Sequence, residues 1–95
     1  MCENKYVKEE ANIFVMDFGF GKAIEVEVNE ANDELFRKLS FEKEQKILGG
    51  VSYVLSVSKV EKIIKKAGSF EKVLAEIKEQ LSQAGYKVKI KEQII

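Results

Sequence analysis

Three carboxylates, Asp17, Glu25 and Glu27, come closest to a catalytic pattern in this sequence. Glu25 and Glu27 alternate along a β-rich run, so their side chains share one face of a predicted strand. Such a pair beside apolar surface can have shifted pKa values and serve acid–base chemistry or hold a hard cation. No third group orients the pair, and a catalyst would need an active site shared between two copies. We therefore expect no catalytic site.

The composition excludes most other catalytic and metal sites. The 95 residues contain no His and a single cysteine, Cys2, so the common triads, dyads and zinc sites cannot form within one chain. Gly19-Phe20-Gly21 precedes a strand and lacks the helix dipole that assists phosphate binding, so it predicts a turn. We expect no bound metal, no cofactor and no enzymatic activity.

Two lysine clusters suggest a different chemistry, the binding of phosphates. Lys59, Lys62 and Lys66 form one stripe of a predicted helix, and Lys87, Lys89 and Lys91 line one face of the last predicted strand. Together they could make a nucleic-acid-binding surface. We favour an ordinary solvated helix face over such a surface, since no aromatic residue is interleaved and Arg37 is the one arginine of the chain.

The strand lysines have a second interpretation. If the last strand lies next to residues 22–28, Lys87, Lys89 and Lys91 would pair across the strands with Glu25 and Glu27. We favour this ion-pair ladder over a carboxylate site.

Exposed apolar residues point to a protein partner. Phe20 lies at the tip of a predicted hairpin, and exposed aromatic side chains are frequent anchors of protein interfaces. A ring that folds back over the edge of the sheet is an equal alternative. We also expect Ile13 and Val15 on the sheet face that helices leave uncovered, where a partner or a second copy would bury them.

The elements that hold these residues begin with a hairpin. Residues 12–18 and 22–28 are β-rich runs that flank the glycines, and pairing Phe18 with Lys22 places Phe14, Met16, Ile24 and Val26 on one inward face. Residues 29–48 then predict a helix with Asn29 as N-cap and a break at Ser40. Gly49-Gly50 ends it.

The second half of the chain repeats strand and helix patterns. Residues 51–57 alternate as a strand, and a capping box from Ser58 to Glu61 begins a helix that Gly68 ends. Ser69 caps the last helix, Gly85 stops it, and residues 86–91 form the final strand.

The predicted order is β-β-α-(α)-β-α-α-β, which indicates an α+β fold of two layers, with one sheet of about four strands covered by helices. We expect a loosely ordered segment over residues 1–11, which contains Cys2, and a single α+β domain over residues 12–95. One cysteine allows no internal disulfide.

The overall charge restricts the class of partner. Sixteen basic residues balance sixteen acidic ones, which argues against a protein that coats polyanions. No signal segment or apolar run long enough to span a membrane occurs, so we expect a cytoplasmic protein. The favoured function is a non-enzymatic protein-interaction module, a regulator or inhibitor that binds a protein or self-associates, of the kind encoded by mobile elements. The alternative is a nucleic-acid-binding domain.

Overall fold

The predicted hairpin lies in the middle of the sheet. The computed structural model describes residues 9–45 and 50–94, and in it β1 (Glu10–Asp17) pairs antiparallel with β2 (Lys22–Val28). Residues 18–21 form the turn, in which the Phe18 amide donates to the Gly21 carbonyl oxygen at 2.9 Å. The Asp17 carboxylate accepts from the Gly19 amide at 2.9 Å, and Gly19 has a φ of 91°, a conformation that suits glycine.

The predicted register of this hairpin is wrong by one residue. Asp17, and not Phe18, pairs with Lys22, because the capped turn takes four residues between the strands. Ile13 therefore lies opposite Val26 and Val15 opposite Ile24. A shift of one residue exchanges the two faces of a strand, so Ile13 and Val15 belong to the core. Phe14 and Met16 take the other face.

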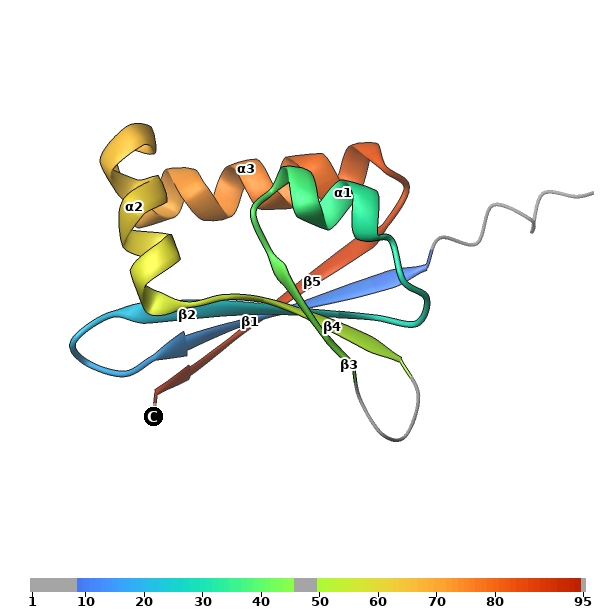
Figure 1. Ribbon diagram of the computed structural model, residues 1–95, viewed down its shortest axis with the longest axis horizontal. Coiled ribbons are helices and arrows are strands. Elements are labelled where there is room, and N and C mark those ends of the chain that lie inside the picture. Colours follow the sequence, from blue (N-terminus) through green and yellow to red (C-terminus); the bar gives the residue numbers. More distant parts are fainter. Residues whose placement is uncertain (1–8, 46–49, 95) are drawn as a thin grey trace, which may run out of the picture.

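Within the described residues, five strands form one mixed sheet in the order β3-β4-β2-β1-β5, one more strand than the sequence predicts. The remaining strands are β4 (Val51–Leu55), which lies next to β2, and the two outer strands, β3 (Glu42–Gln45) and β5 (Lys87–Ile94). Figure 1 shows the three helices on the same side of this sheet. We call the side without helices the open face. The α+β class, with one sheet covered by helices, is confirmed.

The segment after the hairpin departs from the predicted helix over residues 29–48. Among the described residues of this segment, 29–45, the helical ones form α1 (Asp33–Lys38), with Asn32 in place of Asn29 as N-cap. The predicted break at Ser40 is present, with a φ of 71°, but a strand and not a second helix follows it. Polar and charged residues carry that strand, so its sequence has no apolar alternation to reveal it. The predicted helix end at Gly49 lies outside the described residues.

The two later helices agree more closely with the sequence. For α2 (Val57–Ala67), the N-cap is Ser56 and not Ser58, and its hydroxyl accepts from the Lys59 amide at 3.3 Å. The preceding strand accordingly ends at Leu55. The helix α3 (Phe70–Gln83) begins after Ser69, as predicted, and the Ser69 hydroxyl accepts from the Lys72 amide at 3.2 Å.

The last strand closes the sheet next to the first one. β5 runs parallel to β1, and β1 separates it from β2. The arrangement required for a ladder between Glu25, Glu27 and the strand lysines is therefore absent. Lys89 instead pairs with Glu10 of β1, at 3.2 Å between Nζ and the carboxylate oxygen. β1 begins at Glu10, within the segment predicted to be loosely ordered, and Cys2 lies outside the described residues.

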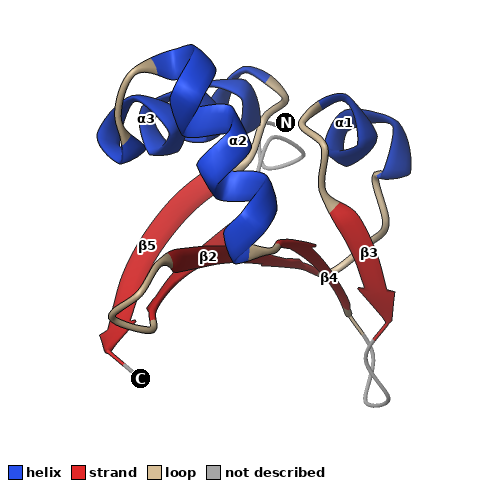
Figure 2. Cartoon of the chain, turned by 60° about the vertical axis from the view of Figure 1, so that its left-hand side comes forward, coloured by secondary structure: helices blue, strands red, loops and turns tan. Residues whose placement is uncertain are grey.

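Aromatic rings join α1 to the sheet. Phe36, the one fully buried residue of α1, stacks on Tyr53 of β4 with ring centroids 3.9 Å apart. Phe41 packs edge-on against the Phe36 ring, with centroids 5.5 Å apart. In Figure 2 α1 stands over the β3 side of the sheet, away from α2 and α3. Phe36 therefore joins α1 to β4, and Leu35 of the same helix also packs against the core.

We expect Phe36→Ala to lower the free energy of unfolding by about 3–5 kcal/mol, because it removes a buried aromatic ring and leaves a cavity. Phe20→Ala is the matched control, since Phe20 is 79% exposed. It should change stability by no more than about 0.5 kcal/mol. Urea denaturation followed by circular dichroism measures both, and equal losses would contradict the packing described here.

Candidate binding surfaces

Two adjoining cavities lie on the helical side of the sheet, and we call them together the interhelical cleft. The first, of about 420 Å³, lies between α1, α2 and α3, above Leu55 of β4. The second, of about 450 Å³, lies between α2 and the segment that joins α1 to β3. Both are lined by Ser40, Ile63 and Lys66, so the two spaces meet at these residues.

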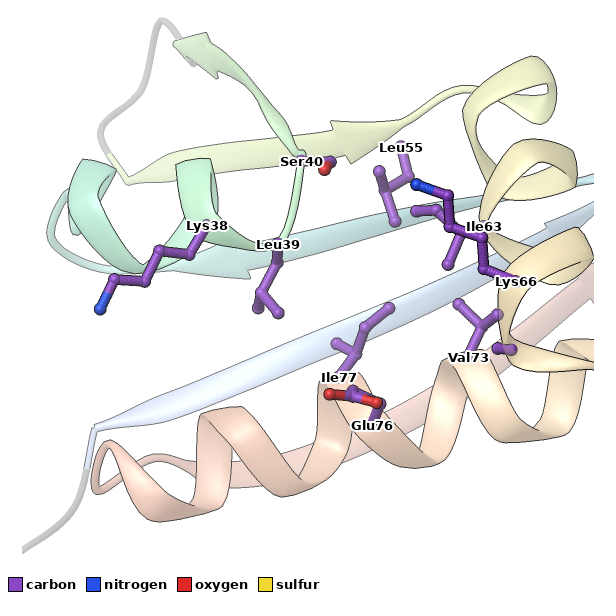
Figure 3. Close-up of a pocket in the computed structure, with 10 residues that line it drawn as sticks. Lys38, Leu39, Ser40, Leu55, Ile63, Lys66, Val73, Glu76 and Ile77 are labelled. Carbon is purple, nitrogen blue, oxygen red and sulfur yellow. The ribbon is translucent and has the colours of Figure 1, made fainter.

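The first cavity has an apolar interior, and we call it the apolar cavity. Figure 3 shows Leu39 reaching in from the end of α1, with Val73 and Ile77 facing it from α3. Leu55 is fully buried beneath them. Lys66 extends from α2 over Ile63 toward Ser40, whereas Lys38 points away from the other side chains. Glu76 is the one carboxylate among the lining residues. The cavity therefore combines an apolar floor with a charged rim.

The second cavity is lined mainly by cations, and we call it the basic cavity. Its charged residues are Arg37, Lys59, Lys62 and Lys66. Lys59 is partly neutralised, because its Nζ lies 3.0 Å from the Glu42 carboxylate. Neither Lys62 nor Lys66 forms an ion pair with any residue in the described part of the chain. Positive charge therefore accumulates at this cavity in a chain whose formal charge is zero.

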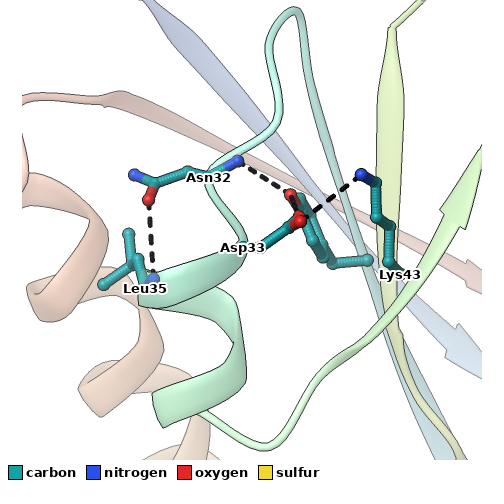
Figure 4. A network of polar contacts seen from close by, with 5 residues as sticks. Asn32, Asp33, Leu35 and Lys43 are labelled. Atoms are coloured by element: carbon teal, nitrogen blue, oxygen red, sulfur yellow. Dashed lines mark hydrogen bonds and ion pairs between the residues drawn. The ribbon is translucent and has the colours of Figure 1, made fainter.

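A hydrogen-bond network fixes the start of α1, which forms one wall of the cleft. The Tyr53 hydroxyl accepts from the Asn32 amide at 2.8 Å and donates to the Asp33 carboxylate at 2.7 Å. Lys43 of β3 pairs with the same carboxylate at 3.5 Å. Figure 4 shows these groups around the N-terminus of α1, where the Asn32 side chain also caps the Leu35 amide. The network joins α1 to β4 and β3 at once.

The network also shifts two pKa values. Burial raises the pKa of Tyr53 from 10.0 to about 12, and the hydrogen bond to Asp33 acts in the same direction. The hydrogen bond from Tyr53 lowers the pKa of Asp33, and the charge of Lys43 lowers it further. Both shifts favour a neutral phenol donating to an ionised carboxylate. The pair is consistent with a structural role, since it caps a helix and lies outside the lining of both cavities.

The six lysines of the predicted nucleic-acid surface do not form one patch. Lys59, Lys62 and Lys66 line the basic cavity on the helical side. The β5 lysines pair in register with Glu10, Asn12 and Phe14 of β1, which places them on the open face. The sheet therefore separates Lys87, Lys89 and Lys91 from the helix cluster.

The predicted partner-binding residues also separate. Ile13 and Val15 are 0% and 2% exposed on the helical side, so they cannot contact a partner, and the register explains the error. Phe20 is 79% exposed, as expected, and stacks on Phe18 with centroids 5.8 Å apart. Ile94, 86% exposed, ends the strand that pairs with Asp17, so it lies at the same end of the sheet as the turn (Figure 1).

The predicted carboxylates belong to different surroundings. Asp17 caps the hairpin turn. Glu25 and Glu27 lie on the open face opposite Phe14 and Asn12, and both take part in polar interactions. Among the described residues, no group of three or more His, Cys, Asp or Glu could hold a metal ion. No described helix has the length and apolar character needed to cross a membrane.

Sequence reasoning missed half of the cleft. Arg37 and Leu39 come from a segment predicted to be the middle of a long helix, and nothing in their spacing relates them to α2. The spacing of Lys62, Ile63 and Lys66 does indicate a helix with a basic face, but the sequence predicts that this face meets solvent.

No family model, curated protein or solved structure matches the chain.

We expect Tyr53→Phe to lower the free energy of unfolding by about 1–3 kcal/mol, because the Asn32 backbone amide loses its acceptor and the Asp33 carboxylate keeps only Lys43 among the described residues. The raised phenol pKa stabilises the fold fully below pH 10, and this contribution is lost as the pH rises toward 12. The difference between the two proteins should therefore shrink over that range. Denaturant titrations at several pH values measure it.

Ser52→Ala is the matched control for this experiment. Ser52 precedes Tyr53 on β4 and is equally buried, but its hydroxyl has no hydrogen-bond partner. Its removal should cost little stability and leave the alkaline behaviour of the protein unchanged. A stability difference between Tyr53→Phe and the unmodified protein that stays constant from pH 9 to 12 would contradict the proposed role of Tyr53.

Proposed function

We propose that this protein is a non-enzymatic protein-interaction module that binds a partner at one end of its sheet. The observation that carries the proposal is the grouping of exposed apolar side chains. The three large hydrophobic residues that are exposed within the described chain are Phe20, Ile90 and Ile94. Phe20 lies on the β1–β2 turn and Ile94 at the adjoining end of β5, while Ile90 lies further back along β5, opposite Ile13. We call this region the apolar end.

The free edge of β5 supports the same proposal. Among the described residues, β5 is an outer strand of eight residues that pairs only with β1, so its other edge presents backbone amides and carbonyls with no sheet partner in this part of the chain. An extended segment of a partner can add to such an edge as a further strand. The β5 lysines on the open face would favour acidic residues on that segment, and Ile90 and Ile94 would favour apolar ones.

A second copy of the chain is a poor partner for this edge. In a two-fold antiparallel pair of β5 strands, residues that face each other lie on the same side of the sheet. Centring the pair on Lys89, Ile90 or Lys91 brings lysine opposite lysine in every case, and like charges in this position are destabilising. The charge pattern therefore favours a different protein over self-association through β5.

This mode of binding is consistent with a regulator or inhibitor, because a module of this kind acts by occupying a surface of another protein. The nucleic-acid alternative is less well supported. A phosphate backbone would have to contact two lysine clusters on opposite sides of the sheet.

We expect Phe20→Ala and Ile94→Gln each to weaken partner binding about tenfold or more, as truncation of an interface anchor does. The partner is first captured on the immobilised protein from a lysate of its source and identified by mass spectrometry. Its affinity for each purified variant is then measured by isothermal titration calorimetry. Lys62→Gln, in the cleft, is the control and should bind normally.

Two outcomes would contradict this proposal. Normal binding by both apolar-end variants would exclude the apolar end as the interface. Capture that disappears after nuclease treatment would assign the interaction to nucleic acid. Because the variants are exposed substitutions, a circular dichroism spectrum that matches the unmodified protein separates lost binding from lost folding.

A further inference from the structure

We infer that the interhelical cleft binds a small amphiphilic anion, with an apolar chain in the apolar cavity and a phosphate monoester in the basic cavity. The site is separate from the apolar end and does not depend on the proposed function. It lies between α2 and α3 on the helical side of the sheet. The two cavities meet there at Ser40, Ile63 and Lys66.

Shape supports a small molecule. Cavities of about 420 and 450 Å³ both fall within the range of roughly 300–1,000 Å³ that is typical of small-molecule sites. The apolar cavity has rigid walls, because Leu55, Val73 and Ile77 are 3% exposed or less and belong to β4 and α3. An alkyl chain placed there would exchange water for contact with Leu39, Ile63 and Ala67, the partly exposed apolar residues of the lining, which is favourable for each methylene group.

Charge supports an anionic head. Apart from Lys38, which points away, the two cavities together are lined by four cations and one carboxylate, Glu76, and Glu42 offsets only Lys59. A ligand with a single carboxylate would neutralise only part of this positive charge. A phosphate monoester carries between one and two negative charges at neutral pH and three acceptor oxygens, which suits an arginine and lysines that surround one space.

The same features disfavour a nucleic acid in this cleft. Sequence-independent binding of single strands relies on aromatic rings on which bases stack. The one aromatic side chain that lines either cavity is Phe41, which is 7% exposed and packs against Phe36. Its neighbours therefore leave no ring face for a base.

The test is isothermal titration calorimetry of the full chain with hexyl phosphate, below the concentration at which it forms micelles. Inorganic phosphate and hexanol are titrated separately as the two halves of the ligand. We expect saturable binding of hexyl phosphate, at least tenfold tighter than binding of either half. Lys62→Gln and Lys66→Gln should each weaken it about tenfold, since each removes a charge-assisted contact. Nuclear magnetic resonance shifts should include Leu39 and Ile77.

Lys65→Gln is the matched control, because Lys65 is an exposed neighbour on α2 that lines neither cavity. Equal weakening by Lys65→Gln would show general attraction to a basic helix and overturn the proposal. So would an absence of saturable binding, or inorganic phosphate that binds as tightly as hexyl phosphate. Displacement of hexyl phosphate by a short single-stranded oligonucleotide or an acidic peptide at lower concentration would assign the cleft to a macromolecule instead.

Discussion

The contact between Tyr53 and the N-terminus of α1 determines where the first helix lies. A helix of six residues is far too short to be stable by itself, so α1 depends on tertiary contacts. Tyr53 supplies two of them, since its ring stacks on Phe36 and its hydroxyl joins the Asn32 amide to the Asp33 carboxylate. Without this anchor, Arg37 and Leu39 would lose their positions opposite α2, and the interhelical cleft would have only two walls.

The elements with local signals could be predicted from the sequence. Glycines bounded the hairpin, and serine caps marked the start of each long helix to within two residues. The register of the hairpin could not be predicted as easily, because Phe14 and Met16 alternate with Ile13 and Val15 and either set can form an apolar face. The deciding group was the Asp17 carboxylate, which lengthens the turn by one residue. The hydrogen bond that this carboxylate accepts from Gly19 cannot be inferred from the pattern of hydrophobic residues.

The surfaces formed by several elements could not be predicted, because they depend on contacts between residues far apart in the sequence. Whether Glu25 and Glu27 meet the β5 lysines depends on strand order, and nothing within either segment encodes that order. The cleft likewise combines α1, α2 and α3, which are adjacent only after folding. The exposed Phe20 was predictable because a turn of four residues has no core within reach. A surface that one local element creates can thus be found in the sequence, whereas a surface between elements cannot.

The parallel pairing of β1 with β5 has a consequence for synthesis on the ribosome. β1 and β5 are separated by about seventy residues, so the chain between them must emerge before the two strands can meet. Until then β1 is the edge of a four-stranded sheet, and it presents Phe14 and Met16 on a strand with little charge at its centre. An edge of this kind invites pairing with other nascent chains. Pairing with β5 covers this edge of β1, and the new outer strand carries lysines, which disfavour pairing with other chains.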